Sequence, residues 1–313
     1  MSNAFVFPGQ GSQAVGMGRA LAAAFPVARE TFEEVDDALG QRLGRLMAEG
    51  PDSELTLTEN AQPALMAVSL AVIRVLEREG GLDLKRHAAV VAGHSLGEYS
   101  ALAAVRAFSL ADAARLLKRR GLAMQRAVPV GAGAMAALMG LDIDAARAVA
   151  AEAAQGEVCA VANDNGAGQV VVSGNKAAVE RAAEAATARG AKRAIMLPVS
   201  APFHCALMEP AAREMEEALA AVRLAEPLLP LIANVTAAAV SNPDEIRRLL
   251  VEQVTGMVRW RESVLAMKQQ GVHDLVEVGA GRVLSGLAKR IDRDFVVSSL
   301  GAPAEIEAFV KTL

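Results

Sequence analysis

The sequence predicts an α/β protein made of a large domain with a mostly parallel sheet and a small ferredoxin-like domain inserted into it. Short apolar runs alternate with helical patterns toward both ends of the chain, as in parallel-sheet proteins. The middle segment instead follows the order β-α-β-β-α-β of a split βαβ unit. The 313 residues leave room for both cores. We therefore expect the large domain at 1–127 and 198–313, and the small domain at 128–197.

The first part of the large domain begins with an apolar run, NAFVF at 3–7, which predicts a strand ending at Pro8. A glycine-rich loop follows, and helical patterns then dominate to about residue 79. The next run, AAVVA at 88–92, is continuously apolar and stops at a glycine, which is typical of a buried parallel strand. Two further helices are expected at 96–106 and at 109–126, the second capped by Ser109.

The small domain is predicted from four short strands and two helices. Asp142 and Asn175 stand where side chains cap the first turn of a helix, and Gly190 ends the second helix. The expected strands are 134–139, 158–162, 169–173 and 192–197, and the helices end near 154 and 190. A turn at 164–168 joins the middle strands.

The second part of the large domain returns to alternating strands and helices after Pro198. A helix follows Met208, and a last helix precedes the final strand. The remaining expected elements are strands at 231–235, 274–278 and 295–300, and helices near 243–254 and 260–270. Because both ends of the chain share this alternation, they are expected to form one discontinuous domain.

Composition excludes several classes of function. The net charge of −4 does not favour a nucleic-acid binder. Two cysteines, Cys159 and Cys205, form neither a disulfide framework nor a zinc pair. The first residues lack the basic segment of a signal peptide, and the longest apolar stretch, at 61–75, is too short and interrupted to span a bilayer. We expect a cytoplasmic protein that does not enter a membrane.

The sharpest local signal is Gly93-His94-Ser95-Leu96-Gly97, a G-x-S-x-G pattern between an expected strand and an expected helix. A tight turn there would lift the serine hydroxyl above the sheet. The amide of Leu96 would lie at the helix N-terminus, where unpaired N–H groups favour an oxyanion. Although the pattern also occurs by chance, this context favours Ser95 as a nucleophile.

A nucleophilic serine needs a base, and the chain has four histidines. His94 adjoins the serine, while His87 and His273 stand in structural or surface contexts. His204 lies in a loop between the two expected domains, where catalytic groups concentrate. By elimination alone, His204 could still have a purely structural role. No Asp or Glu stands in an obvious strand-end loop before it, which favours a serine–histidine dyad oriented by a backbone carbonyl.

Four motifs together resemble one family. They are Phe7-Pro8-Gly9-Gln10-Gly11-Ser12-Gln13, Gly93-His94-Ser95-Leu96-Gly97-Glu98-Tyr99, Arg120-Gly121 and Phe203-His204. In order and over essentially the whole chain, they are similar to malonyl-CoA:acyl carrier protein transacylases and to the acyltransferase domains of polyketide and fatty-acid synthases. The resemblance implies a hydrolase-like large domain and a ferredoxin-like small domain. It also implies malonyl-CoA and acyl carrier protein as partners, no metal, and no cofactor beyond the coenzyme A thioester; we expect a monomer.

The resemblance assigns roles to individual residues. Ser95 would be acylated, and His204 would be its base. The amides of Gln10 and Leu96 would form the oxyanion hole, Arg120 would hold the malonyl carboxylate, and the main-chain carbonyl of Gln253 would orient the histidine. Asn163 and Asn165 match residues near the mouth of the cleft, and Phe203 matches the malonyl-selective type.

Simpler interpretations stand beside these roles. Arg120 ends a basic helical turn that would complement the helix dipole. Asn163 and Asn165 could be turn residues. The loop of Gln10 could cradle a phosphate, but no Gly-Lys-Ser/Thr follows it.

The function expected from this pattern is ping-pong transfer of a malonyl group to an acyl carrier protein for fatty-acid biosynthesis. The alternatives are the acyltransferase subunit of malonate decarboxylase, a polyketide pathway, a serine thioester hydrolase, and a non-catalytic carrier-binding module. A hydrolase would need water in place of the carrier thiol, and a binding module would not need Ser95, His204 and Gln10 together.

Overall fold

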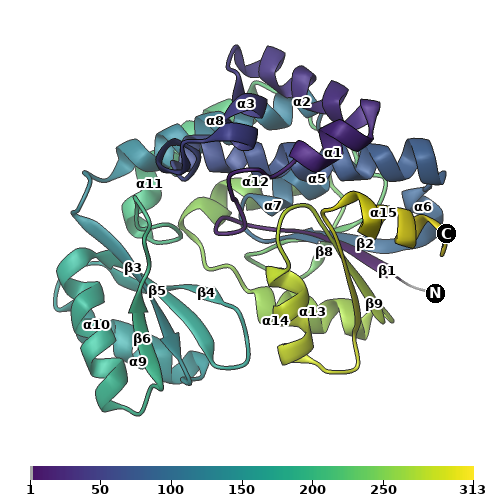
Figure 1. Ribbon diagram of the computed structural model, residues 1–313. Coiled ribbons are helices and arrows are strands. Elements are labelled where there is room, and N and C mark those ends of the chain that lie inside the picture. The colour runs from purple at the N-terminus through teal and green to yellow at the C-terminus, as the bar shows by residue number, and fades with distance from the viewer. Residues whose placement is uncertain (1–2) are drawn as a thin grey trace.

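The large domain is built on a six-stranded sheet with the order β10-β9-β1-β2-β7-β8. The computed structural model describes residues 3–313 (Figure 1). All neighbouring strands are parallel except β7 and β8, so the predicted fold class is confirmed. The strands are β1 (Asn3–Phe7), β2 (Ala88–Gly93), β7 (Leu231–Ile232), β8 (Ala239–Val240), β9 (Asp274–Val278) and β10 (Val296–Leu300).

Helices cover both faces of this sheet (Figure 1). They are α1 (Arg19–Ala24), α2 (Pro26–Leu39), α3 (Leu43–Glu49), α4 (Asp52–Leu55), α5 (Thr58–Gly80), α6 (Leu84–His87), α7 (Gly97–Ala104), α8 (Leu110–Ala127), η1 (Ala206–Met208), α11 (Glu209–Ala220), α12 (Pro243–Thr255), α13 (Trp260–Gln269), α14 (Val283–Ile291) and α15 (Pro303–Val310). No helix in the described part of the chain is long and apolar enough to cross a membrane.

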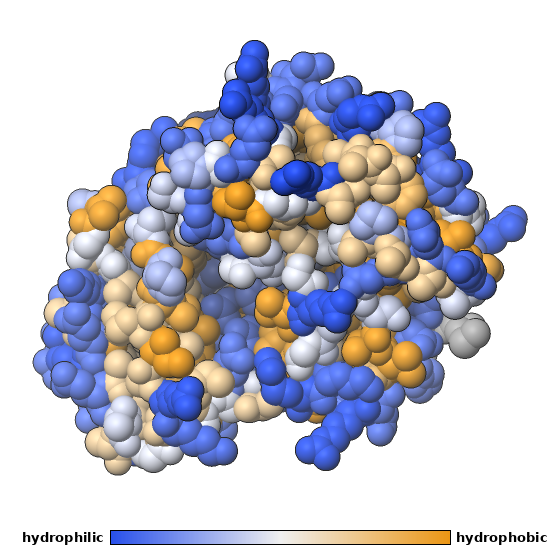
Figure 2. Space-filling model, viewed as in Figure 1, coloured by the Kyte–Doolittle hydropathy of each residue, from blue (hydrophilic) through white to orange (hydrophobic). Residues whose placement is uncertain are grey.

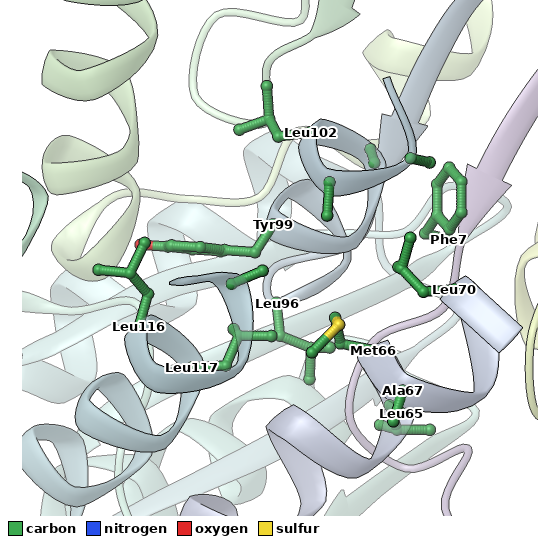
Figure 3. Close-up of a cluster of buried hydrophobic side chains, with 14 of the residues drawn as sticks. Phe7, Leu65, Met66, Ala67, Leu70, Leu96, Tyr99, Leu102, Leu116 and Leu117 are labelled. Carbon is green, nitrogen blue, oxygen red and sulfur yellow. The ribbon is translucent and has the colours of Figure 1, made fainter. Parts of the chain in front are cut away.

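Alternation along β1 separates the two cores of the large domain. Phe5 and Phe7 join the helices α2, α5, α7, α8, α11 and α12 in one core, whereas Ala4 and Val6 join α13 and α14 in the other. Successive strand residues point to opposite faces, so a strand covered by helices on both sides is apolar throughout. Figure 3 shows part of the first core, with Leu96 and Tyr99 packed among side chains of α5 and α8.

The small domain is an antiparallel sheet with the order β4-β5-β3-β6. Its elements are β3 (Gly133–Met139), α9 (Ile143–Ala154), β4 (Cys159–Asp164), β5 (Gln169–Asn175), α10 (Lys176–Ala188) and β6 (Arg193–Met196). This is the split βαβ arrangement predicted from the sequence. Its alanine- and valine-rich core lies between the sheet and its two helices. The boundaries at residues 128 and 197 stay a prediction.

The predicted helix caps and strand lengths were confirmed in part. Ser109 and Asp142 cap their helices by accepting from the amides of Asp112 and Ala145. Asn175 does not cap α10 with its side chain, because its Oδ1 accepts from the amide of Val158 and so joins β5 to the start of β4. The strand predicted at 231–235 is also shorter, because the chain turns at Ala233 and returns as β8.

Candidate active site

Ser95 lies in the sharp turn between β2 and α7, with φ 53 in the left-handed region. A Cβ on Gly93 would lie 2.0 Å from the carbonyl carbon of Gly97. A Cβ on Gly97 would lie 2.3 Å from the Phe7 carbonyl oxygen. Both separations are far below van der Waals contact, so glycine is required at both positions of the motif. The turn therefore holds a strained serine over the sheet, as the sequence predicted.

His204 meets Ser95 although 109 positions separate them in the chain. The Ser95 hydroxyl donates to His204 Nε2 over 2.8 Å. On the other side of the ring, Nδ1 lies 2.8 Å from the Gln253 carbonyl oxygen and 3.1 Å from that of Gly256. Two carbonyl acceptors place the proton on Nδ1, which leaves Nε2 free to accept a proton. Within residues 3–313, no carboxylate contacts this ring.

The environment keeps His204 neutral. Burial, together with the nearby Arg120 charge, lowers the pKa of His204 to about 3. Both effects disfavour the imidazolium form. The ring is therefore in its proton-accepting form at neutral pH, as a general base must be.

Arg120 lies on α8 with its side chain turned to the same point. Its Nη2 donates to Ser95 Oγ over 3.1 Å and to Gln253 Oε1 over 2.7 Å, while Nη1 donates to Gln62 Oε1 over 2.8 Å. The side chain is only 1 % exposed, and burial lowers the pKa of Arg120. An arginine nevertheless stays protonated in proteins, so the site holds a buried cation suited to a carboxylate.

The close packing of α8 against α5 brings Arg120 to the site. A Cβ on Gly121 would lie 2.4 Å from the Cα of Glu59, so only glycine allows the two helices to approach this closely. Gly121 therefore lets α8 lie close to α5, and this places the Arg120 side chain at the site.

Two main-chain amides near Ser95 remain free to bind an oxyanion. Within the described residues, the amides of Leu96 and Gln10 donate no hydrogen bond, whereas the Ser95 amide is occupied by Asn234 Oδ1 at 2.7 Å. Leu96 is the N-cap of α7, where the helix dipole favours negative charge. Gln10 follows β1, and its side chain accepts from Thr58 Oγ1 over 3.0 Å. The assignment of these amides to the oxyanion hole stays a prediction that this geometry supports.

The three remaining candidates adjoin residues that neighbour this centre. Asn165 Oδ1 lies 3.0 Å from His94 Nε2, so His94 points away from the Ser95–His204 pair and toward the small domain. Asn163 is buried at the end of β4, where the backbone bridges to Val258 of the large domain. Phe203 is buried next to His204. Figure 2 shows that the surface is hollowed between the small domain at its left and the large domain.

The structure adds three buried polar residues to which the sequence interpretation gave no role: Gln62, Glu98 and Asn234. Glu98 accepts from the amide of Asn234 over 2.5 Å and from the side chain of Gln253. Burial raises the pKa of Glu98 to about 8. Their sequence signals were present but weak: Gln62 interrupts an apolar helix, Asn234 follows a short strand, and Glu98 stands inside the serine motif.

Comparisons with known proteins agree with this geometry. The model of the acyl transferase domain family matches residues 4–291. The malonyl CoA-acyl carrier protein transacylase of Escherichia coli K12 is 48 % identical over 305 residues, which cover 97 % of each chain. The crystal structure of the acyl-carrier-protein S-malonyltransferase from Bartonella henselae is 55 % identical and superposes with a TM-score of 0.97, covering 100 % of this chain and 99 % of the other.

A second similar structure contains a partner chain. It holds a type II polyketide synthase acyl-carrier protein in complex with its malonyl-transacylase, and that chain is 43 % identical to this one, with a TM-score of 0.96 and full coverage of both. Likenesses of this extent cover both domains and every residue of the Ser95 site. The chain therefore belongs to the acyl transferase domain family, among the malonyl CoA-acyl carrier protein transacylases.

Proposed function

We propose that this protein transfers the malonyl group of malonyl-CoA to the phosphopantetheine thiol of an acyl carrier protein and so supplies malonyl-carrier for fatty-acid biosynthesis. The observation that carries the proposal is the contact of Ser95 Oγ with both His204 Nε2 and Arg120 Nη2. A nucleophile, its base and a cation for the acyl carboxylate thus meet at one atom. The relatives named for this activity match the chain over nearly its whole length.

The first half-reaction acylates Ser95. His204 Nε2 takes the hydroxyl proton as Oγ attacks the thioester carbonyl, and the Gln253 carbonyl stabilises the resulting imidazolium through Nδ1–H. The amides of Leu96 and Gln10 receive the negative charge on the carbonyl oxygen. The carbon–sulfur bond then breaks, and the coenzyme A sulfur leaves with the proton from His204. The products are malonyl-Ser95 and free coenzyme A.

The second half-reaction follows the same steps in reverse, with the carrier thiol in place of coenzyme A. The carrier thiol gives its proton to His204 and attacks the malonyl ester, and Ser95 recovers its proton when the ester bond breaks. The same amides serve both half-reactions. Neither half-reaction changes the net charge or the oxidation state of the reacting groups, so residues of the chain can carry out every proton transfer.

Arg120 is the basis for selecting malonyl among acyl groups. A planar guanidinium can hold a carboxylate through two parallel hydrogen bonds, which acetyl cannot accept. Phe203 would limit branching beside the acyl group, and Asn163 and Asn165 would line the entrance from the small domain. We further propose that the protein acts as a monomer in the cytoplasm, in keeping with its two free cysteines.

A polyketide carrier is the second candidate partner. The similar malonyl-transacylase crystallised with a type II polyketide synthase acyl-carrier protein favours this alternative. The chemistry at Ser95 would be the same with either carrier, so the two candidates differ only in the surface that the carrier presents. Rates of transfer to a fatty-acid carrier and to a polyketide carrier, compared at equal concentration, distinguish them.

The experiment that tests the function is intact mass spectrometry after incubation with malonyl-CoA. We expect the wild-type protein to gain one malonyl group that persists without a carrier and disappears when carrier is added, with malonyl-carrier as the product. The Ser95→Ala variant should gain none. Rapid release of free malonate without a carrier would instead identify a hydrolase, and absence of any adduct on wild-type protein would reject the proposal.

A further inference from the structure

Arg120 is a buried cation whose hydrogen-bond partners in the described residues are all amide or hydroxyl oxygens. Within residues 3–313 its three hydrogen bonds go to the Gln62 and Gln253 amide oxygens and to Ser95 Oγ, and none goes to a carboxylate. Its Nε is buried without a hydrogen-bond partner in the same residues. Buried charges are normally paired because removing a charge from water is strongly unfavourable. The site therefore holds a positive charge whose permanent partners are all neutral.

Gln62 holds one side of the guanidinium in a fixed orientation. Its side chain is 1 % exposed on α5, and its Nε2 donates to Thr58 Oγ1 over 2.8 Å. Thr58 in turn donates to Gln10 Oε1 over 3.0 Å. This sequence of donors and acceptors fixes which end of the Gln62 amide carries the oxygen, and the oxygen faces Arg120 Nη1 at 2.8 Å.

Gln253 holds the other side in the same manner. Its Nε2 donates to the Ser95 carbonyl oxygen over 2.8 Å and to Glu98, so its Oε1 faces Arg120 Nη2 at 2.7 Å. Gln253 thus stands between Arg120 and the buried acid Glu98. Burial raises the pKa of Glu98 to about 8, so this acid is also mostly uncharged at neutral pH.

We propose that Gln62 is a positioning residue that determines acyl specificity: it orients Arg120 with a neutral acceptor and so leaves the guanidinium charge for the acyl carboxylate. The proposal rests on the proposed malonyl transfer. A carboxylate at this position would orient Arg120 equally well, but it would also neutralise it before substrate arrives. The choice of an amide rather than an acid is therefore what keeps the cation available.

The test replaces Gln62 by the acid of the same shape, Gln62→Glu. The measured quantity is kcat/KM for acylation of Ser95 by malonyl-CoA and by acetyl-CoA. We expect the malonyl value to fall about 10- to 100-fold, since the substrate carboxylate loses a charge-assisted hydrogen bond and meets a like charge. The acetyl value should stay level or rise, because acetyl makes no use of the cation.

Two further variants separate charge from packing. Gln62→Met keeps the length of the side chain but removes the acceptor, so we expect a higher KM for malonyl-CoA with a smaller change in kcat, and a smaller change still for acetyl-CoA. Asn60→Asp is the matched control, an amide-to-acid change two positions away on α5, where the side chain contacts Lys118 instead of Arg120. We expect it to leave the ratio of malonyl to acetyl rates unchanged.

The outcomes distinguish the inference from the function on which it rests. Equal losses for malonyl and acetyl in Gln62→Glu and Gln62→Met would show that Gln62 only supports packing and would overturn the inference. If Gln62→Glu does not fold, Gln62→Met decides alone, and an unchanged malonyl-to-acetyl ratio overturns the inference. Wild-type protein that fails to transfer malonyl would instead reject the proposed function, whatever these variants do.

Discussion

Asn234 fixes the turn that carries the nucleophile, and its removal should slow acylation without changing acyl preference. The side chain is fully buried after β7. Its Oδ1 accepts from the Ser95 amide over 2.7 Å, and its Nδ2 donates to the Gly93 carbonyl oxygen over 2.7 Å. One side chain thus bridges two sides of the turn. Asn234→Ala removes both bonds, together with a longer one of 3.4 Å from Gln253 Nε2, and leaves the Ser95 and Gly93 groups without these partners.

The size of the effect follows from these two contacts. Each buried group that loses its partner costs about 1–3 kcal/mol, so the native turn loses about 2–6 kcal/mol if nothing relaxes. Ser95 is held at a strained φ of 53, and relaxation would move its hydroxyl away from His204, now 2.8 Å distant. A misplacement of about 1 Å costs roughly 100-fold in rate. We therefore expect kcat/KM to fall about 100-fold for malonyl-CoA and acetyl-CoA alike, because Arg120 keeps both glutamines.

The assay is acylation of Ser95 by each thioester, measured together with urea unfolding. Asn242→Ala is the control, since Asn242 caps α12 through the amides of Asp244 and Glu245. It should lower the free energy of unfolding by about 1 kcal/mol with unchanged rates. If Asn234→Ala loses stability but keeps its acylation rate, the turn does not depend on this side chain. A malonyl rate that falls much further than the acetyl rate would place its action on Arg120 instead.

Two further predictions concern the cation and the base. Arg120→Ala should lower malonyl acylation by about 100-fold or more, while acetyl acylation is retained or gained. The control Arg119→Ala removes an exposed partner of Glu214 and should change neither rate. Equal loss of malonyl and acetyl acylation in Arg120→Ala would show that Arg120 does not hold the malonyl carboxylate. With the pKa of His204 lowered to about 3, the base stays neutral as pH falls, so acylation should hold level from about pH 7.5 to about pH 5.5, where an ordinary histidine would lose roughly tenfold. A pH profile with a midpoint at about 6.5 would contradict the burial of this ring.

The order of strands and helices could be predicted because each element leaves a periodic signal in the sequence. The strands β1 and β2 are almost entirely apolar runs, and the structure buries them between two helical layers. The small domain was found from the change of rhythm alone. Elements with weak local signals were missed: β8 has two residues, and its pairing with β7 depends on a turn at Ala233 that no periodicity marks.

The centre of the site could be predicted only in pieces. The glycines around Ser95 mark the turn because a Cβ at either would overlap the backbone. Elimination made His204 one candidate for the base, the family resemblance assigned it that role, and its contact with Ser95 required the fold. Gln62 and Asn234 carry no motif of their own, since an amide in a helix or after a strand is common. Their importance arises from the atoms that other segments bring to them, and a single sequence does not record those distances.

The position of the small domain follows from the path of the chain through the site. Arg120 lies in the second half of α8, the chain then enters the small domain with β3, and after β6 it returns to the large domain to place His204. The insertion therefore joins the two segments that supply the cation and the base, so it must emerge beside Ser95. The contacts that hold it there include the Asn165 side chain to His94, the backbone bridge from Asn163 to Val258, and the ion pair of Asp164 with Arg261. Val258 lies two residues beyond Gly256, whose carbonyl accepts from His204. The domain that borders the hollow is thus also joined, over a few residues, to one of the two carbonyls that orient the base.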